Sequence, residues 1–376
     1  MRHSSARPVS GDLDEVALLA DLVRTPSVSG DEAAVAQLVE QVAQRLGLPV
    51  RRDDAMVAIE LDSGRPGRHL ALVSHLDTVP VGPGWTRAPF SADIESGRLW
   101  GRGANDAKAS VAAMIGAALD VQRAGGPQGG KLWVVLGYCE ETRDTSMPRA
   151  VPRLGRLDAA VVGEPTSLDL AVAQRGLLMC DLIAHGDACH AAYAAERGAQ
   201  SAVLQLAADL LQLPHLLTER PHPLLGQPTI TPTWLEAGIA RNVMPPVAKA
   251  VLDLRTTPSW DHAELQAHLQ RQLRSEVVVT SSRLQPCETP PGSPLLAAAL
   301  ELSPNARRYG SPTCSDWVFL RHLDAIKCGP GDSRVSHTAD EWVSLDEVRA
   351  ARRFYAALAS HYLANHNLAT PEPVSV

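Results

Sequence analysis

The sequence predicts an α/β protein whose chain is interrupted by a smaller α+β domain. Its 376 residues exceed an ordinary single domain and fit two. Apolar runs of strand length alternate with helical segments near both ends of the chain, which is typical of open α/β sheets. Between about residues 173 and 285 this pattern changes. We therefore assign residues 1–172 and 286–376 to one discontinuous domain and residues 173–285 to an inserted domain.

Helices in the larger domain are predicted from an apolar stripe and a recognisable end. They cover residues 13–23, 31–46, 107–121 and 344–363. The first stops before Pro26, and the second ends at Gly47, a residue that suits a helix terminus. Ser344 and Glu347 have the spacing of a capping box at the start of the last helix.

Apolar runs of the larger domain end in polar, metal-binding or glycine-rich residues. Four such runs cover residues 69–73, 131–137, 159–162 and 325–327. In open α/β sheets the binding crevice lies beyond the carboxyl ends of the strands. We therefore expect residues that are far apart in the sequence to converge at this edge.

The inserted domain has a different, mixed pattern. Residues 176–185 and 248–255 read as strands, and residues 201–211 read as a helix. The proline-rich segment 286–292 is the predicted return to the larger domain. The sequence thus favours an α+β insertion.

Composition excludes several classes of function. The net charge of −7 argues against a nucleic-acid or anionic-membrane partner, and no apolar run is long enough to span a bilayer. Residues 1–11 are basic but lack the apolar core of a signal peptide, so they read as a loose tail. Six cysteines without a CxxC pair indicate free thiols rather than disulfide bridges or a zinc finger. These features predict a cytoplasmic protein.

Two of the strand-end motifs are ambiguous on their own. His75 at the end of an apolar run can bind a metal through one ring nitrogen, and Asp77 on the same strand face can orient it. A surface histidine is the alternative interpretation. Asp106 follows a glycine-rich loop at the start of a helix, where it is either a helix cap or a carboxylate that bridges two cations.

Three further motifs place acids and a histidine at strand ends or turns. Glu140 and Glu141 are adjacent acids directly after a strand, and like charges there repel unless a cation is present or one acid is protonated. One of them can bind a metal while the other acts as general base, and spacing does not decide which. Glu164 follows another strand, and His337 follows a glycine-rich turn. Imidazole and carboxylate ligands without a thiolate suit zinc, cobalt or manganese.

At this point the chain resembles a family of metallopeptidases and deacylases that includes carboxypeptidase G, succinyl-diaminopimelate desuccinylase and acetylornithine deacetylase. The resemblance extends from about residue 16 to residue 358. The motifs that carry it are LVRTPSVSG (22–30), SHLDTVP (74–80), GRGANDAK (101–108), EET (140–142), GEPT (163–166), NVMP (242–245), DLR (253–255) and GPGDSRVSHTADE (329–341). Their fixed order is far more specific than any single motif.

This resemblance implies a di-metal, aminopeptidase-like catalytic domain with a mixed sheet and helices on both faces, plus a lid or dimerisation domain. His75, Asp106 and Glu164 would hold one metal ion. Asp106 would be shared with a second ion, whose other ligands would be Glu141 and His337. Zn²⁺ is the first expectation for both ions, with Co²⁺ or Mn²⁺ as alternatives.

Catalytic roles also follow from the resemblance. Glu140 would be the general base and Glu141 the ligand, a distinction that spacing leaves open. Asp77 would orient the histidine ligand. His190 would stabilise the oxyanion, either in its own subunit or in a partner subunit of a homodimer.

Substrate-binding roles are implied for four residues. Asn242 and Arg255 match residues that bind the substrate carboxylate, although Arg255 also reads as an ordinary salt-bridge arginine. Gly329 and Gly331 would offer backbone amides to the same group, or simply form a tight turn.

The C-terminal motif most resembles the acetylornithine and acetylcitrulline deacetylase branch. We therefore expect a metal-dependent amidohydrolase that deacetylates N-acetylornithine in arginine biosynthesis, or the analogous derivative of citrulline or lysine. A succinyl-diaminopimelate desuccinylase, a dipeptidase and a carboxypeptidase are the alternatives of the same class. A non-catalytic metal-binding homologue is the alternative of another class, and the intact Glu140 argues against it.

Four positions depart from the pattern that is common in the family. They are Ala109, Gln174, Cys189 and Cys314. None removes a metal ligand or the general base, so the departures bear on substrate recognition.

Overall fold

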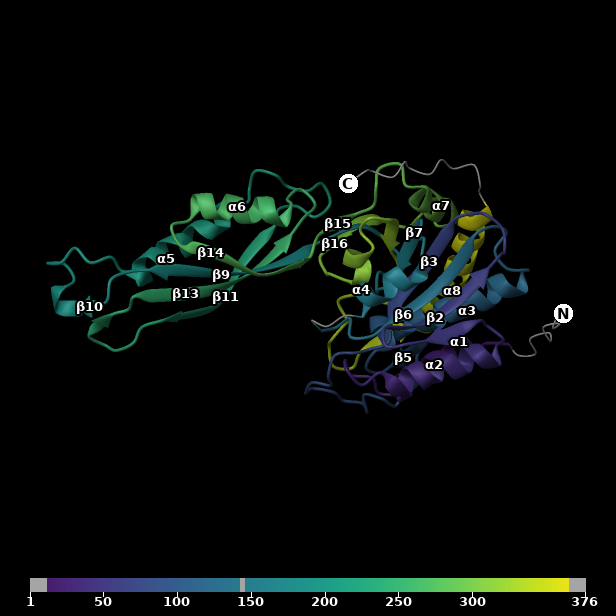
Figure 1. Cartoon of the computed structure of the whole chain (residues 1–376). Helices are drawn as coiled ribbons and strands as arrows, with labels where there is room; N and C mark the ends of the chain where they lie inside the picture. The colour runs from purple at the N-terminus through teal and green to yellow at the C-terminus, as the bar shows by residue number, and fades with distance from the viewer. Residues whose placement is uncertain (1–11, 143–145, 365–376) are drawn as a thin grey trace. The chain divides into compact units, whose positions relative to one another are not determined.

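The computed structural model describes residues 12–142 and 146–364, which fold into two compact units (Figure 1). The larger unit contains the described parts of 1–172, 289–308 and 315–376, and the smaller unit contains 173–288 and 309–314. Residues 286–288 and 309–314 were predicted in the larger domain. Both segments instead belong to the smaller unit, where the N–H of Arg175 donates to the Ser311 carbonyl at 3.1 Å.

A mixed β-sheet forms the centre of the larger unit. Its strands lie in the order β1 (Val50–Arg52), β2 (Met56–Asp62), β6 (Lys131–Gly137), β3 (His69–His75), β7 (Ala159–Val162), β17 (Asp324–Lys327) and β8 (Leu170–Gln174). The β6–β3, β3–β7 and β7–β17 pairs are parallel, and the β1–β2 and β2–β6 pairs are antiparallel. The four predicted apolar runs are therefore four adjacent parallel strands.

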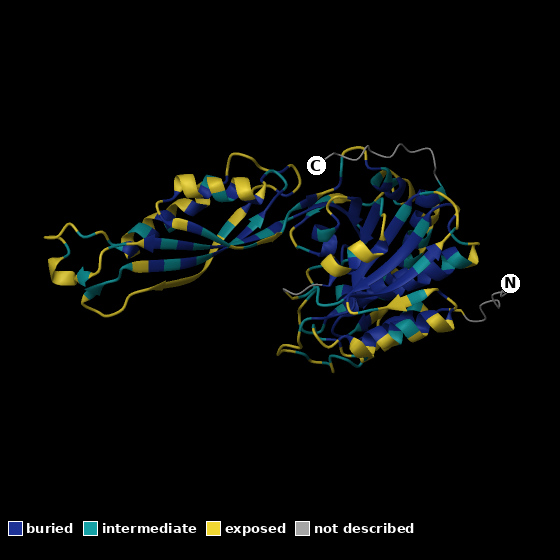
Figure 2. Cartoon of the chain, in the orientation of Figure 1, coloured by how far each residue is buried: buried dark blue, intermediate teal, exposed yellow. Residues whose placement is uncertain are grey.

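Helices cover this sheet because its central strands are apolar on both faces. The helices of the larger unit are α1 (Glu15–Arg24), α2 (Ala33–Arg45), α3 (Ala109–Arg123), α4 (Met147–Ala150), α7 (Pro294–Leu302) and α8 (Leu345–Ala364). Apolar residues of α1, α2, α3, α7 and α8 join those of the strands in one core. Figure 2 shows the buried sheet and the exposed outer faces of the helices. A small antiparallel sheet of β4 (Asp93–Glu95), β5 (Arg98–Trp100) and β18 (Trp342–Ser344) completes this unit.

The smaller unit is built on a four-stranded antiparallel sheet. Its strand order is β11 (Thr229–Ala237), β13 (Val247–Thr256), β9 (Gly176–His185) and β14 (Glu276–Leu284). Two helices, α5 (Ala202–Gln212) and α6 (His262–Gln272), contribute to its own apolar core. The short strands β10 (Cys189–His190) and β12 (Val243–Met244) pair with each other. The short strands β15 (Cys287–Glu288) and β16 (Arg308–Ser311) both pair with β8 and extend the mixed sheet. A mixed α/β sheet with a separate antiparallel sheet confirms the predicted fold class.

Most predicted elements lie where expected, and two local predictions are wrong. The helix predicted to begin at residue 107 begins at Ala109, because Asp106 and Ala107 have non-helical backbone angles. The capping box is not formed, since the Glu347 carboxylate accepts a hydrogen bond from the Gly331 N–H at 2.7 Å. Both differences concern segments that bear on the candidate site.

No helix among residues 12–142 and 146–364 combines the length and apolar character that a membrane crossing requires. All six cysteines lie within these residues, and all six are free thiols. Cys180, Cys287 and Cys328 are buried, while the other three are half-buried. The predicted N-terminal tail, residues 1–11, lies outside the described residues.

The turn before β6 offers a test of close backbone packing. Gly126 and Gly130 both have positive φ angles, of 82° and 65°. A Cβ atom at Gly126 meets open space, whereas one at Gly130 would lie 1.9 Å from the Arg68 carbonyl oxygen. We expect Gly126→Ala to lower the free energy of unfolding by about 1 kcal/mol. Gly130→Ala should cost a further ~1–3 kcal/mol, because the backbone must move. Equal costs in urea unfolding would contradict this explanation.

Candidate metal centre

His75 is the last residue of β3, and the residue two positions later fixes its imidazole. The His75 Nδ1 atom lies 3.0 Å from the Asp77 carbonyl oxygen and 3.4 Å from Asp77 Oδ1. Both side chains are almost completely buried. Because Nδ1 faces these oxygens, Nε2 is the nitrogen available to a metal ion. This geometry supports the orienting role predicted for Asp77.

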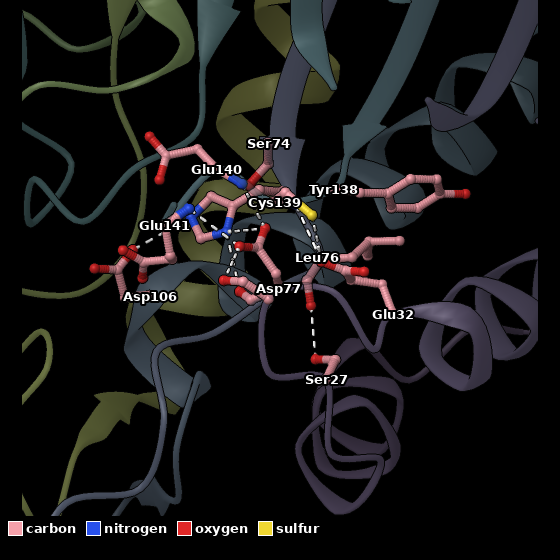
Figure 3. Close-up of polar contacts among 12 residues, drawn as sticks. Ser27, Glu32, Ser74, Leu76, Asp77, Asp106, Tyr138, Cys139, Glu140 and Glu141 are labelled. Carbon is pink, nitrogen blue, oxygen red and sulfur yellow. Dashed lines mark hydrogen bonds and ion pairs between the residues drawn. The ribbon is translucent and has the colours of Figure 1, made fainter. Parts of the chain in front are cut away.

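The Asp77 carboxylate also holds the turn that follows β6 (Figure 3). Its Oδ1 accepts a hydrogen bond from the Glu140 N–H, and its Oδ2 accepts one from the Glu141 N–H, both at 3.0 Å. Ser29 Oγ donates to Oδ2 at 2.7 Å. Burial opposes ionisation of Asp77, but the hydrogen bonds from His75 and Ser29 outweigh it and lower the pKa of the carboxyl. One carboxylate therefore positions a histidine and two glutamates.

Asp106 lies between two histidines that come from distant parts of the chain. Its Oδ1 is 3.5 Å from His75 Nε2, and its Oδ2 is 3.5 Å from His337 Nε2. Burial opposes ionisation of this carboxyl, yet His337 and His75 lower its pKa far below the ordinary value. With each oxygen facing a different imidazole, Asp106 has the geometry of a bridging ligand.

Glu141 and Glu164 complete a group on each side of Asp106. Glu164 Oε1 is 3.8 Å from His75 Nε2, and Glu141 Oε1 is 2.9 Å from His337 Nε2. The structure thus brings together all five residues predicted as metal ligands. His337 occupies its place with a left-handed backbone, at a φ angle of 64°.

The donor set fits divalent cations. Ligand atoms of His75, Asp106 and Glu141 all lie within 4.8 Å of one another. Burial, together with the Asp106 carboxylate, raises the pKa of Glu164 to about 8. Crowded carboxylates of this kind are stabilised by a cation, and two imidazoles with three carboxylates and no thiolate suit zinc, cobalt or manganese.

Glu140 stands apart from these ion pairs. Burial, reinforced by the nearby carboxyl groups of Glu164 and Asp316, raises the pKa of Glu140 well above its ordinary value, although His75 opposes the shift. Its backbone N–H is held by Asp77. A half-buried carboxyl with a raised pKa beside the candidate metal centre has the properties of a general base that later returns its proton.

Two buried acids near the centre received no role from the sequence. Asp316 lies in a short helical turn, Asp316–Phe319, and its Oδ1 has no hydrogen-bond partner among the described residues. Burial raises the pKa of Asp316 to about 7, against the opposing effect of His75. Glu341 accepts hydrogen bonds from the Asp106 N–H and from Arg102. Glu341 ends the motif at residues 329–341, whereas Asp316 lies outside the quoted motifs, and no local pattern marks either acid as buried.

The glycine turn does not present its amides as predicted. The Gly329 N–H donates to Thr166 Oγ1 at 3.0 Å, and the Gly331 N–H donates to Glu347 Oε2 at 2.7 Å. Both donors expected for the substrate carboxylate are therefore occupied within the protein. Gly331 has a φ angle of 92°, which favours glycine at this position whether or not the turn binds a ligand.

The remaining predicted residues belong to the smaller unit. His190 Nε2 lies 3.4 Å from Asn242 Nδ2, and both residues are exposed. Arg255 makes two hydrogen bonds to the Asp253 carboxylate, at 2.8 and 3.1 Å. Arg255 therefore forms a salt bridge with Asp253 in this structure. Its binding of a substrate carboxylate stays a prediction.

Comparison with known proteins now decides the family. Residues 71–361 match the model of peptidase family M20/M25/M40. The chain belongs to this family. It is 30% identical over 384 residues to a succinyl-diaminopimelate desuccinylase of Cereibacter sphaeroides, with 94% of this chain and 100% of the relative covered. It is 28% identical to succinyl-diaminopimelate desuccinylase 2 of a Ruegeria species, with 96% and 98% covered.

Solved structures agree on the fold of this family member. An M20 metallo-carboxypeptidase from Sulfolobus solfataricus superposes with a TM-score of 0.74 at 18% identity, covering 94% of this chain and 100% of the other. A dinuclear metal-binding M20 peptidase from Bacillus subtilis gives 0.73 at 14% identity, covering 93% and 97%. The predicted family is therefore confirmed. The two relatives carry the desuccinylase name, which the sequence analysis ranked below acetylornithine deacetylase.

Metal binding to this M20 protein should release protons. Hydrogen bonds to Asp106 and Glu141 raise the pKa of His337 to about 10, so its imidazole is protonated at pH 7 in the metal-free chain. A metal ion binds only the neutral ring. The apparent affinity for Zn²⁺ should therefore rise about tenfold per pH unit for each proton released between pH 6 and 8.

Calorimetry of the metal-free protein in two buffers with different ionisation enthalpies would count these protons. His337→Ala should release fewer, while His185→Ala, an exposed histidine of the smaller unit, should behave as the wild type. An affinity for Zn²⁺ that does not change with pH would contradict the prediction.

Proposed function

We propose that the chain is a di-metal amidohydrolase that splits the acyl amide of an N-acylated amino acid. The observation that carries this proposal is the position of Asp106, whose two oxygens face two separate histidine–carboxylate groups. Beside them lies Glu140, a half-buried carboxyl that makes no ion pair with either histidine among the described contacts. Family membership supports the same reaction class.

The mechanism assigns separate tasks to adjacent residues. When bound, two such ions lower the pKa of a water molecule toward neutrality and polarise the acyl carbonyl. Glu140 takes a proton from the attacking water and gives it to the leaving amine nitrogen as the C–N bond breaks. Asp77 holds the Glu140 and Glu141 amides, so the base keeps its position beside the ligand.

The smaller unit is proposed to act as the lid. Its closure would exclude water and bring in a donor for the oxyanion, a task that we assign to His190. Asn242 lies next to that imidazole and is proposed to bind the substrate carboxylate. Arg255 can take part only if its guanidinium exchanges Asp253 for the substrate carboxylate. Gly329 and Gly331 would likewise have to leave their present acceptors, so we give them no part.

The substrate that we favour is N-succinyl-diaminopimelate. Both relatives described above bear the name of its desuccinylase and are matched over nearly their whole length. N-acetylornithine, favoured by the C-terminal motif, becomes the alternative, together with the acetyl derivatives of citrulline and lysine. Zn²⁺ is the proposed native metal, with Co²⁺ as the substitute most useful in assays.

A substrate panel tests this choice. With added Zn²⁺ or Co²⁺, we expect release of succinate from N-succinyl-diaminopimelate with a kcat/KM roughly 10–100-fold above that for any acetylated substrate. One charge-assisted contact to the succinyl carboxylate, of about 1.5–3 kcal/mol, accounts for this ratio. Faster release of acetate from N-acetylornithine would reverse the assignment. Hydrolysis of no N-acyl amino acid or dipeptide would overturn the enzymatic function.

Glu140→Gln separates catalysis from metal binding. The amide cannot take up a proton, so kcat should fall roughly 10²–10⁴-fold while both metal ions remain bound. Metal content is measured after dialysis, and kcat with the best substrate of the panel. Glu301→Gln, an exposed glutamate of α7, is the control. If metal content falls with kcat, Glu140 is a ligand rather than the base.

The smaller unit is also the proposed surface of a homodimer. Helix α5 exposes an apolar stripe at i, i+3, i+4 and i+7 that consists of Leu204, Ala207, Ala208 and Leu211. Leu204 is 71% exposed and Leu211 is 79% exposed, which is costly for a helix that meets only water. On the edge strand β11 of the same unit, the apolar side chain of Trp234 is exposed as well.

Substitution of this stripe tests the dimer. We expect the wild type to elute with twice the chain mass of 40.1 kDa in light-scattering chromatography. The Leu204→Asp/Leu211→Asp variant should elute as a monomer, because two buried charges would oppose association. Ile94→Asp, which changes an exposed residue of the larger unit, should stay dimeric. A wild type that is monomeric at micromolar concentration would contradict the proposal.

A further inference from the structure

The loop that carries Asp106 is tied to the loop that carries His337 by one side chain. Asn105 is completely buried. Its Nδ2 donates to the Asp332 carbonyl at 3.1 Å and to Ser336 Oγ at 3.0 Å. Its Oδ1 accepts a hydrogen bond from the Asp332 N–H at 3.0 Å. Both N–H groups and the oxygen of this amide are therefore engaged by the segment directly before His337.

The Asn105 side chain packs closely against the backbone of the turn at Gly331. A Cβ atom at Gly331 would lie 2.1 Å from Asn105 Oδ1. The turn before Asp332 can therefore approach the asparagine only because residue 331 is a glycine.

Glu341 ties the same two loops from the other side. Its Oε1 accepts hydrogen bonds from the N–H groups of Asn105 and Asp106, at 2.9 and 3.0 Å. Its Oε2 forms a buried ion pair with Arg102 at 2.6 Å, and the Glu341 carbonyl accepts from the Gly101 N–H at 2.8 Å. The main chain at Asp106 and directly before it is thus anchored to the segment that follows His337.

Apart from Asp106, which the two proposed ion positions share, these contacts reach the ligands of one position and not those of the other. His75 ends β3 and Glu164 follows β7, and neither residue is among the hydrogen-bond partners of Asn105. His337 follows Ser336 directly, and Asp106 follows Asn105 directly. A shift at Asn105 would change the distance between Asp106 and His337 while leaving the ends of the parallel strands in place.

We infer that Asn105 is a positioning residue that sets the second metal site, the one formed by Asp106, Glu141 and His337, independently of the first. The inference rests on the proposed di-metal function. Asn105 touches neither ion nor substrate. It acts by holding the His337 loop at the distance from Asp106 at which one ion can bind both side chains, as partners beyond the ligands of metal sites commonly do.

The test is a titration of the metal-free full chain with Co²⁺, with stoichiometry measured by elemental analysis after dialysis. The wild type should bind two ions. Asn105→Ala should keep the affinity for the first ion within about twofold and lose roughly 10–100-fold in affinity for the second. His337→Ala should lose the second ion too, and the Asn105→Ala/His337→Ala double variant should bind no more weakly than His337→Ala.

Control variants separate positioning from general damage to the loop. Arg334→Ala removes an exposed side chain that pairs only with Asp332 among its described contacts, and it should bind both ions normally. Ser336→Ala removes one of the three Asn105 contacts and should weaken the second ion several-fold. This milder variant decides the question if Asn105→Ala does not fold, and an unchanged second affinity would then overturn the inference.

Two outcomes overturn the inference directly. One is an Asn105→Ala variant that binds two ions as the wild type does. The other is an equal loss of both ions, which would mark Asn105 as a general stabiliser of the fold. A wild type that binds fewer than two ions would instead overturn the proposed di-metal function. Because the readout is metal binding, a chain that binds two ions without hydrolysing any substrate leaves the test of Asn105 intact.

Discussion

The site depends on one buried carboxylate that receives two successive backbone amides. Parallel pairing places His75 of β3 opposite Gly137 of β6, so the turns after both strands start side by side. Asp77 spans them, with its oxygens on the Glu140 and Glu141 N–H groups and beside the His75 ring. An uncharged acceptor could satisfy only part of this set. Asp77 therefore fixes the proposed base, Glu140, and two proposed ligands, His75 and Glu141, relative to one another.

Electrostatics explains why the centre needs such firm support. The acidic groups there come from six different segments and lie in a largely buried environment, where like charges repel strongly. In the metal-free chain the histidines offset part of this repulsion through pairs such as His337 with Glu141. Rigid backbone anchors such as Asp77 and Glu341 keep the acids close although they repel. Without cations, repulsion between these acids raises the free energy of the folded chain. With the acids already held in place, cations can bind with little rearrangement.

The sequence predicted elements with strong periodicity and missed those without it. Strands β9 and β13 alternate buried and half-buried residues, and both were predicted. Strand β11 contains Pro232 and is mostly exposed, so no alternation marks it. Motif order predicted all five metal ligands that now lie together, whereas the buried states of Asp316 and Glu341 depend on tertiary packing. Likewise, no spacing rule indicates that the Asp253 carboxylate would form an ion pair with the Arg255 guanidinium.

The proposed ligands follow one another from His75 to His337, and this order has a consequence for biosynthesis. The three residues proposed for the first ion are complete once the ribosome has passed Glu164. The second ion lacks its imidazole until His337 emerges, and the long α8 helix follows that residue. The two ions would therefore become bindable at different stages of synthesis, and loading of the second would be a late event on a nearly finished protein.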